Sequence, residues 1–256
     1  MSGLEVRHED GALWLTLNRP EQFNALTGEI VLRGTELLRA ATTQDKVRVV
    51  VLTGAGGAFC AGADLGGADA RERYDAESVD AANHLIRAVV ELDKPVVCGL
   101  NGIAAGVGMS LALACDLVVA RESAALTLAF TKLGLMPDGG ATATVAASVG
   151  RARAMRLALL SDLLSAREAY DAGLVSYVFA DDGYLQGLEE IVRRLSCGAP
   201  LAFAATKKAV NSATLGGLEE AFARERAGQA VLLRTDDVAE GISAFTDKRR
   251  AEFQGR

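Results

Sequence analysis

Two glycine-rich segments contain backbone groups that could do chemistry on a carbonyl compound. The first, GAGGAFCAGADLGG, covers residues 54–67, and the second, NGIAAGVG, covers residues 101–108. Amide N–H groups near Ala63 and Val107 could point into a cavity, the second at a helix N-terminus, whose dipole favours negative charge. Two such donors make an oxyanion hole. The alternative is structural, because glycine also serves tight turns and close packing.

Neither segment is a phosphate-binding loop of a known kind. The first lacks the pattern GxxxxGKS/T, and the glycines of the second do not spell GxGxxG. We therefore do not expect nucleotide phosphates to bind through these motifs.

A carboxylate in the segment GLMPDGGAT is the main candidate for proton transfer. Asp138 has apolar neighbours at Leu133, Leu135 and Met136. A carboxyl group in such surroundings has a raised pKa, which suits proton transfer near neutral pH. An aspartate before Gly-Gly at a helix start is also an ordinary N-cap, so a structural role stays open. His84 is a weaker candidate, for which a surface or half-buried position is the default.

Alternating strands and helices must position these residues. Asp10-Gly11 predicts the turn of a β-hairpin, and Thr27 is predicted to cap a helix. Buried strands are predicted at 47–53, 96–100 and 117–120, a loop at 54–67, a polar surface segment at 68–80, and helices from about 106, at 151–160 and along 185–195. Such alternation implies parallel strands with helical crossovers. From about Ala199 only helical patterns appear, so an α/β part precedes an all-α tail.

The stretch Val96–Cys115 has 20 consecutive uncharged residues, which is nominally enough to cross a bilayer. Gly99, Gly102 and Gly106 divide it into a strand, a turn and a helix start. The basic flanks that a membrane span favours are also missing beside Asp116. We therefore expect the buried centre of an α/β domain and no membrane partner.

The composition is that of a globular chain of 256 residues, 50% of them hydrophobic and 23% charged. The 27 basic and 33 acidic residues give a net charge of −6, so no global basic field attracts nucleic acid. Cys60, Cys98, Cys115 and Cys197 show no metal-ligand spacing, which favours free thiols in a reducing cytoplasm. The first 20 residues lack the pattern of an export signal, so a cytoplasmic location is expected.

Five segments, in order, resemble the signature segments of the crotonase, or enoyl-CoA hydratase/isomerase, superfamily. They are LNRPEQFNALT, VVVLTGAGGAFCAGADL, NGIAAGVGMSLALACDLVVA, GLMPDGGAT and FTDKRRAEFQG. The resemblance implies an α/β fold in which a spiral of ββα units, over residues 1–197, precedes a helical trimerisation region over residues 198–256. It also implies a homotrimer or a hexamer built as a dimer of trimers.

The ligands of that superfamily are acyl-CoA thioesters, and no metal or redox cofactor is expected. By motif position, the amides of Ala63 and Val107 would hold the thioester oxygen. Most relatives have glycine where this chain has Val107. Because only the backbone N–H of this residue would bind the thioester oxygen, the valine side chain is expected to narrow the pocket without removing the oxyanion hole. The other expected substrate-binding and CoA-binding residues are Asp64, Leu65 and Gly66 along the pantetheine path, with Arg19, Ala25, Ala61 and Lys248.

The acid/base positions depart from the hydratases of the superfamily. Those enzymes hold a water molecule with two glutamates, and the matching positions here are Ser110 and Phe130, which cannot act as bases. Asp138 instead matches the aspartate of phenylacetate-pathway-type enoyl-CoA isomerases and the nucleophile of chlorobenzoyl-CoA dehalogenases. The leading hypothesis is a shift of the double bond from 3-enoyl-CoA to 2-enoyl-CoA. The alternatives are hydration of 2-enoyl-CoA, hydrolytic dehalogenation and a catalytically silent acyl-CoA binder.

Overall fold

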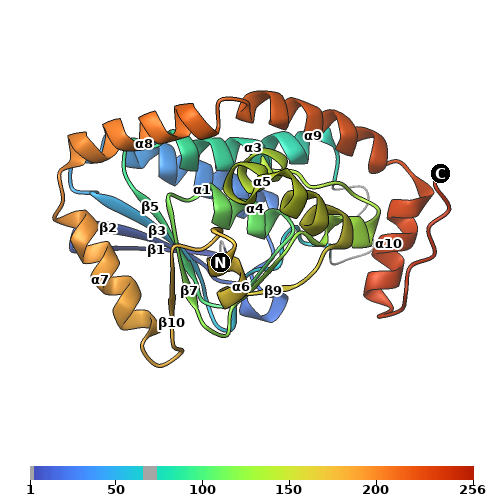
Figure 1. The fold of residues 1–256 in the computed structure, drawn as a ribbon, viewed down its shortest axis with the longest axis horizontal. Helices are drawn as coiled ribbons and strands as arrows, with labels where there is room; N and C mark the ends of the chain where they lie inside the picture. Colours follow the sequence, from blue (N-terminus) through green and yellow to red (C-terminus); the bar gives the residue numbers. More distant parts are fainter. Residues whose placement is uncertain (1–2, 66–73) are drawn as a thin grey trace.

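Two β-sheets and the helices that follow their strands make up the fold in the computed structural model, which describes residues 3–65 and 74–256 (Figure 1). The six-stranded sheet has the order β1 (Leu4–Glu9), β2 (Ala12–Leu17), β3 (Val49–Gly54), β5 (Val96–Leu100), β7 (Leu117–Arg121) and β10 (Tyr177–Phe179). The four-stranded sheet has the order β4 (Ala58–Cys60), β6 (Ile103–Ala105), β8 (Ala125–Thr127) and β9 (Leu164–Ser165). Only β1 against β2 and β8 against β9 pair in antiparallel fashion among these strands.

The first hairpin forms as its turn residues predict. β1 and β2 pair in register from Leu4 against Leu17 to Glu9 against Ala12. Asp10 and Gly11 have φ of 47° and 81°, which is the left-handed conformation. A two-residue hairpin turn needs this conformation to match the right-handed twist of the two strands that it joins.

The large sheet is buried on both faces, which explains why its central strands are continuous apolar runs. One face, which carries Leu13, Val50 and Cys98, belongs to the main core with the helices α1 (Gly28–Ala41), α3 (Ala76–Glu91) and α4 (Val107–Ala114). The other face carries Trp14 and Val51 and packs against α7 (Tyr184–Ser196).

The chain repeats one local plan, with a strand in each sheet followed by a helix. The units are β3, β4 and α3, then β5, β6 and α4, then β7, β8, the 3₁₀ helix η2 (Ala129–Leu133) and α5 (Ala141–Leu160). This is the spiral of ββα units that the resemblance implies. The prediction that residues 54–67 form only a loop was wrong, because β4 lies inside them. A strand of three residues between glycines is too short to show a period of two.

The helix predicted at 151–160 is confirmed as the second half of α5, because non-helical dihedral angles at Gly150, whose φ is 74°, divide Ala141–Leu160 into two helices. The helical predictions need one further correction. The polar segment predicted at 68–80 ends in the first turns of α3, which Asp75 caps through the amides of Glu77 and Ser78. Thr27 caps α1 as predicted and accepts from the Ile30 amide.

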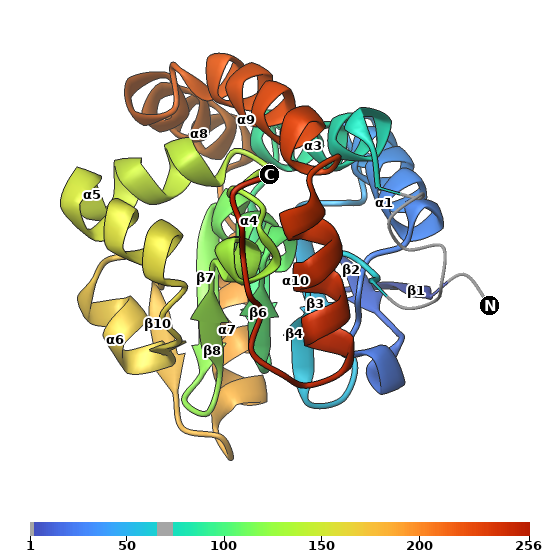
Figure 2. The same cartoon turned by 90° about the vertical axis from the view of Figure 1, so that its right-hand side faces the viewer.

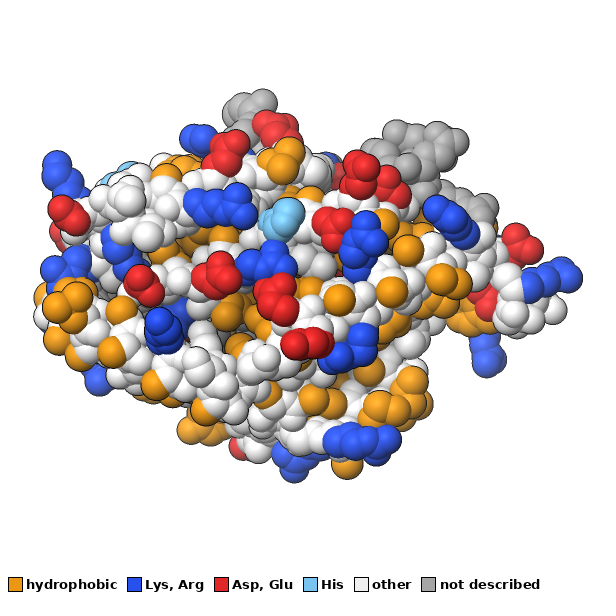
Figure 3. Space-filling model, turned by 90° about the horizontal axis from the view of Figure 1, so that it is seen from above, with side chains coloured by type: hydrophobic (Ala, Val, Ile, Leu, Met, Phe, Trp, Pro, Cys, Tyr) orange, Lys and Arg blue, Asp and Glu red, His pale blue; other side chains and the backbone are white. Residues whose placement is uncertain are grey.

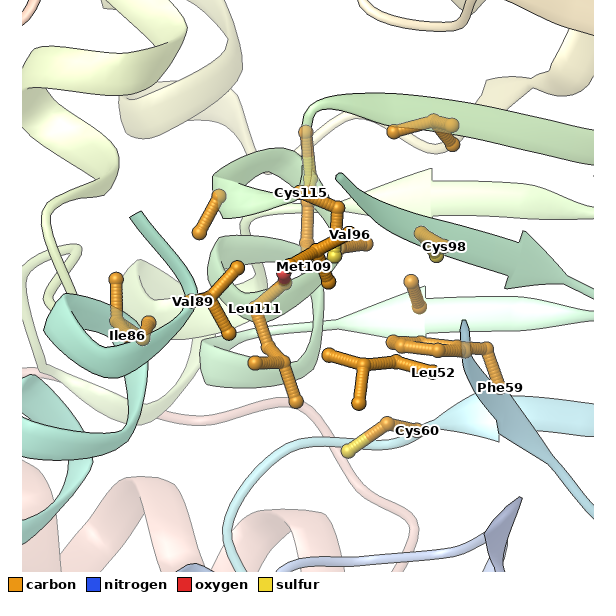
Figure 4. Packing of buried hydrophobic residues seen from close by; sticks show 14 of the residues in the cluster. Leu52, Phe59, Cys60, Ile86, Val89, Val96, Cys98, Met109, Leu111 and Cys115 are labelled. Carbon is orange, nitrogen blue, oxygen red and sulfur yellow. Dashed lines mark hydrogen bonds between the residues drawn. The ribbon is translucent and has the colours of Figure 1, made fainter. Parts of the chain in front are cut away.

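Helix α4 lies in the middle of the molecule, and its side chains are apolar except for that of Ser110. Figure 4 shows its Met109 and Leu111 between Val89 of α3 and the strand residue Cys98. The uncharged stretch is thus divided among β5, β6 and a helix of 8 residues. Within residues 3–65 and 74–256, none of the helices combines the length and apolar character that crossing a membrane takes.

The C-terminal part is helical, as predicted, and lies over the core. It consists of α8 (Pro200–Thr214), α9 (Leu218–Leu232) and α10 (Asp236–Thr246), after α6 (Ala166–Asp171), α7 and β10. Helices α8 and α9 run along one side of the molecule, over α3, and α10 covers one end (Figures 1 and 2). Lys207 of α8 donates to the Val89 carbonyl at 2.8 Å and to Asp116 at 2.9 Å, which fastens α8 to the core.

We predict that Gly108→Ala destabilises the protein, although alanine is the better helix former. A Cβ at Gly108 would overlap the Cys60 carbonyl oxygen and lie 2.8 Å from the Cys60 Sγ. Overpacking of this kind costs about 1–3 kcal/mol. Gly57→Ala is the matched control, because nothing lies within 4 Å of its added Cβ. Denaturant unfolding measures both, and an unchanged or higher stability of Gly108→Ala would contradict the tight packing of α4 on β4.

Candidate active site

A pocket of about 740 Å³, its open mouth included, lies between the first glycine-rich segment, the start of α4 and the C-terminal helices. Its lining is mostly apolar, with Asp138 and Tyr74 as its titratable side chains among the described residues. The lining residues include Ala61, Gly62, Ala63, Leu65, Val107, Phe130, Asp138, Gln229, Leu233, Val238 and Ile242.

Two buried asparagines hold the first glycine-rich segment beside this pocket. Nδ2 of Asn24 donates to the carbonyls of Ala55 and Ala58 at 2.9 and 2.8 Å. Nδ2 of Asn101 donates to Gly56 and Ala58, each at 3.0 Å. The segment is therefore fixed by specific hydrogen bonds from two buried side-chain amides to its backbone carbonyls.

Ala63 and Val107, whose amides are predicted to form an oxyanion hole, both line this pocket. The Leu26 amide donates to the Gly62 carbonyl at 2.7 Å and the Asp64 amide to the Leu26 carbonyl at 3.0 Å, which leaves the Ala63 amide between them unused. Val107 is the first residue of α4, where the amide has no intrahelical acceptor. Neither amide donates to any group within residues 3–65 and 74–256.

The two segments that carry these amides are in close contact. A Cβ built on Gly62 would lie 3.7 Å from the Val107 nitrogen and 2.9 Å from the Ala105 oxygen. Gly62 also has φ of 99°, which a side chain would strain. This arrangement can bring two unused N–H groups to one oxygen atom, which is the requirement for an oxyanion hole.

Asp138 is not the N-cap of α5, so the alternative that Asp138 only caps this helix was wrong. The N-cap is Gly140, which makes no side-chain hydrogen bond. The capping carboxylate belongs to Glu225 of α9, which accepts from the Gly140 amide at 2.7 Å and from the Thr142 amide at 2.9 Å. Asp138 is therefore left free for a role in the pocket.

The carboxyl group of Asp138 is buried with one hydrogen bond. Its Oδ2 accepts from Nε2 of Gln229 at 2.7 Å, and its Oδ1 is buried without a partner among the described residues. Burial raises the pKa of Asp138 to about 7; the Gln229 hydrogen bond lowers it, and the nearby Glu225 carboxylate raises it further. A carboxyl group with this pKa can accept and return a proton near neutral pH.

Ser110 and Phe130, the positions that hold glutamates in hydratases, have other contacts here. The Ser110 hydroxyl is buried and donates to the Asp138 carbonyl at 2.8 Å, so it fixes the turn that carries Asp138. Phe130 lies in η2 and presents its ring to the pocket. Neither residue supplies a second acid or base.

The residues predicted to bind CoA are only partly gathered at the pocket. Ala61 and Leu65 line it. Arg19 forms an ion pair with Asp64 at 2.7 Å and donates to the Ala25 carbonyl at 2.8 Å, so it joins the N-terminal loop to the first glycine-rich segment. These CoA-binding roles stay predictions.

Three further sequence candidates lie elsewhere or outside the described part. Lys248 is exposed after α10, with φ of 55°. His84 is exposed on α3 and is not among the residues that line the pocket. Gly66 lies outside the described residues.

Sequence reasoning missed Glu225 and Gln229, which are 0% and 1% exposed. They stand one helical turn apart on α9 and both contact the Asp138–Thr142 segment. The available signal was a pair of polar residues four apart, but surface helices carry the same pattern. Sequence reasoning also missed Leu233, Val238 and Ile242, which form an apolar wall from the end of α9 and from α10.

We predict that Asp138→Asn removes the loss of folding stability that the wild-type protein shows as the pH rises and the buried carboxyl group ionises. The unfolded chain ionises Asp138 near its ordinary pKa of 3.8 and the folded protein only near 7, so wild type loses stability as the pH rises between these values. We expect equal stability at about pH 4 and a more stable variant at about pH 8, by up to about 4 kcal/mol, because each pKa unit between the folded and unfolded states corresponds to about 1.4 kcal/mol. Urea unfolding at both pH values measures this, and parallel pH profiles for the two proteins would contradict the raised pKa.

Known proteins resemble this chain in both sequence and structure. The family Enoyl-CoA hydratase/isomerase matches residues 7–256. The chain is 39% identical over 253 residues to a 1,2-epoxyphenylacetyl-CoA isomerase of Escherichia coli K12, with 97% of each protein covered, and 38% identical over 256 residues to a 2,3-dehydroadipyl-CoA hydratase of the same organism, with 100% of each covered. A crystal structure of an enoyl-CoA hydratase from Mycobacterium avium subsp. paratuberculosis K-10 superimposes with a TM-score of 0.93 at 44% identity and covers 98% of both chains. The chain belongs to the enoyl-CoA hydratase/isomerase family.

Proposed function

We propose that the protein is an isomerase that shifts the double bond of a 3-enoyl-CoA to give a 2-enoyl-CoA. The observation that carries this proposal is Asp138, the one carboxylate among the described residues that line the pocket. An isomerase needs one group that removes a proton and returns it, whereas the hydratases of the family use two carboxylates to hold water.

The thioester carbonyl would bind with its oxygen between the Ala63 and Val107 amides. Oδ1 of Asp138 takes the proton from C2, and the electron pair of the C2–H bond moves into the C1–C2 bond as the thioester oxygen becomes an enolate oxygen. The amides stabilise this charge more strongly than that of the ground-state carbonyl. The double bond then moves from C3–C4 to C2–C3 as Asp138 returns the proton to C4, so no atom is gained or lost.

Hydration is the nearest alternative, and the relatives carry names of both kinds. Ser110 and Phe130 disfavour it, because a hydroxyl bound to a backbone carbonyl and a phenyl ring cannot activate water. The similarity to a 1,2-epoxyphenylacetyl-CoA isomerase supports isomerisation of a CoA thioester as the reaction class.

We predict that Asp138→Asn loses isomerisation by about 10²–10⁴-fold, the usual contribution of a general base. The purified protein is offered 3-enoyl-CoA and 2-enoyl-CoA in parallel, and products are separated by chromatography. Acyl-CoA affinity is expected to persist in the variant, since the two amides are unchanged. His84→Gln is the matched control, because this side chain is exposed and outside the pocket lining.

Two results would overturn the proposal. Efficient hydration of 2-enoyl-CoA by wild type would identify a hydratase. Tight binding of both thioesters without any turnover would identify a silent acyl-CoA binder.

We also propose that the protein assembles as a trimer or as a dimer of trimers. Leu201 and Val210 of α8 and Val231 of α9 are 85%, 54% and 67% exposed, which a water-facing helix surface does not favour. Figure 3, which views the molecule from the side of these helices, shows exposed hydrophobic patches beside charged side chains of both signs. Light scattering is expected to give three or six times the chain mass of 26.7 kDa, and a monomeric mass would contradict the proposal.

A further inference from the structure

Helix α9 places two polar side chains, Glu225 and Gln229, inside the protein beside Asp138. Burying a carboxylate or an amide costs free energy unless its polar atoms are paired. For Glu225, three hydrogen bonds from Gly140 and Thr142 at the start of α5 offset this cost. For Gln229 this cost is offset only in part, because its Oε1 is buried without a partner among the described residues.

The orientation of the Gln229 amide is fixed by a second acceptor. Its Nε2 donates to the Met136 carbonyl at 2.9 Å and to Oδ2 of Asp138 at 2.7 Å. The flipped amide would place its oxygen against the Met136 carbonyl, where two acceptors repel each other. Gln229 is therefore held as a donor toward Asp138, whichever protonation state Asp138 adopts.

Close packing of α9 brings this donor into reach. Gly228 precedes Gln229, and a Cβ at Gly228 would overlap the Met136 Sδ. Without a side chain at 228, the helix can approach the segment that carries both acceptors. The Ser110 hydroxyl holds the Asp138 carbonyl from the other side, so the backbone and one carboxylate oxygen of Asp138 are both anchored.

We propose that Gln229 is a positioning residue that occupies Oδ2 of Asp138, keeps the carboxylate form available and leaves Oδ1 as the atom that removes and returns the substrate proton. The inference rests on the proposed isomerase function. The Gln229 amide donates to the Met136 carbonyl and to Oδ2 of Asp138, so it cannot move to Oδ1 during the reaction. The same oxygen, Oδ1, therefore removes the proton from C2 and returns it to C4.

Few charged groups compete with this hydrogen bond. Glu225 of α9 is the charged side chain that faces Asp138 among the described residues, and Tyr74, the other titratable residue of the pocket, donates to the Asp64 carbonyl. The side-chain atoms nearest to a Cβ built on Gly139 or Gly140 belong to uncharged residues, which are Ile86 of α3, Val107 and Ser110 of α4, and Leu218 and Phe222 of α9. Gln229 and Glu225 therefore act on Asp138 with opposite sign.

The test compares Gln229→Met, which keeps the length of the side chain without a donor, with Glu225→Gln, which removes the neighbouring negative charge. For Gln229→Met we expect the acidic limb of the kcat profile to move up by about one pH unit, with kcat about tenfold lower at low pH and recovered at high pH. For Glu225→Gln we expect a shift to lower pH. KM is expected to change little in Gln229→Met, since the oxyanion amides are untouched.

Gln229→Glu is the second variant in case the methionine substitution impairs folding. Its carboxyl group would share a proton with Asp138, so the limb is expected to move up further. Lower stability of both Gln229 variants with an unmoved acidic limb would show a merely structural role and overturn the inference.

A measurement that needs no turnover separates this inference from the proposed function. The Asp138 carboxyl carbon can be titrated by NMR in protein with ¹³C-labelled aspartate, its signal being the one missing from Asp138→Asn. A higher midpoint in Gln229→Met than in wild type supports the inference, and an unchanged midpoint overturns it. A shifted midpoint in a protein that isomerises no 3-enoyl-CoA would leave the control of Asp138 by Gln229 standing and would refute the proposed function.

Discussion

The contact between the start of α4 and β4 is the constraint on which the site depends. Gly108 lies directly against Cys60, so the first turn of the helix and the end of the short strand share space that no side chain could enter. This contact sets the distance between the segments that carry the Val107 and Ala63 amides. Seven of the eight residues of α4 are buried, and its side chains are apolar except for that of Ser110, as a helix packed inside the core requires. Figure 4 shows two of them, Met109 and Leu111, among other core residues. An oxyanion hole made of backbone amides thus depends on packing more than on any side chain in it.

The N-terminal end of α5 shows how two carboxylates a short distance apart can be kept in different roles. Burial raises the pKa of Glu225, but its three hydrogen bonds to the amides and the Thr142 hydroxyl at the helix start oppose this effect and favour its charged form. Asp138 lies just before the same helix start, receives one side-chain hydrogen bond and has its pKa raised mainly by burial. The protein therefore supplies the helix with a cap from a distant segment. That arrangement releases the aspartate, which local sequence rules would assign to capping, for the pocket.

Much of the fold was predictable from local sequence signals. Most of the elements and residues that the sequence did not reveal have a common physical cause. The Asp10-Gly11 turn and the β-branched strand β3, predicted at 47–53 and found at Val49–Gly54, are encoded by neighbouring residues, so their patterns are visible in the sequence. The strands β4 and β6 have three residues each and are stabilised by pairing with one another, which is a tertiary interaction without a local signature. Residues Ala63, Val107 and Asp138 could be singled out because they lie in unusual glycine-rich sequence. Gln229 could not, because its importance comes from the hydrogen bonds that α9 makes after docking, and its spacing from Glu225 is common on surface helices.

The apolar wall formed by Leu233, Val238 and Ile242 has a consequence for how such a site can change over time. The amides and the carboxylate expected to act on the substrate come from the region between residues 63 and 138, whereas this wall comes from the last helices of the chain. Substitutions in the wall can therefore alter the shape offered to an acyl group while the two amides and Asp138 stay in place. Gln229 links the two regions, because it lies one helical turn before Leu233 and donates to Asp138. Changes at the end of α9 can therefore affect the shape of the pocket and the carboxylate together.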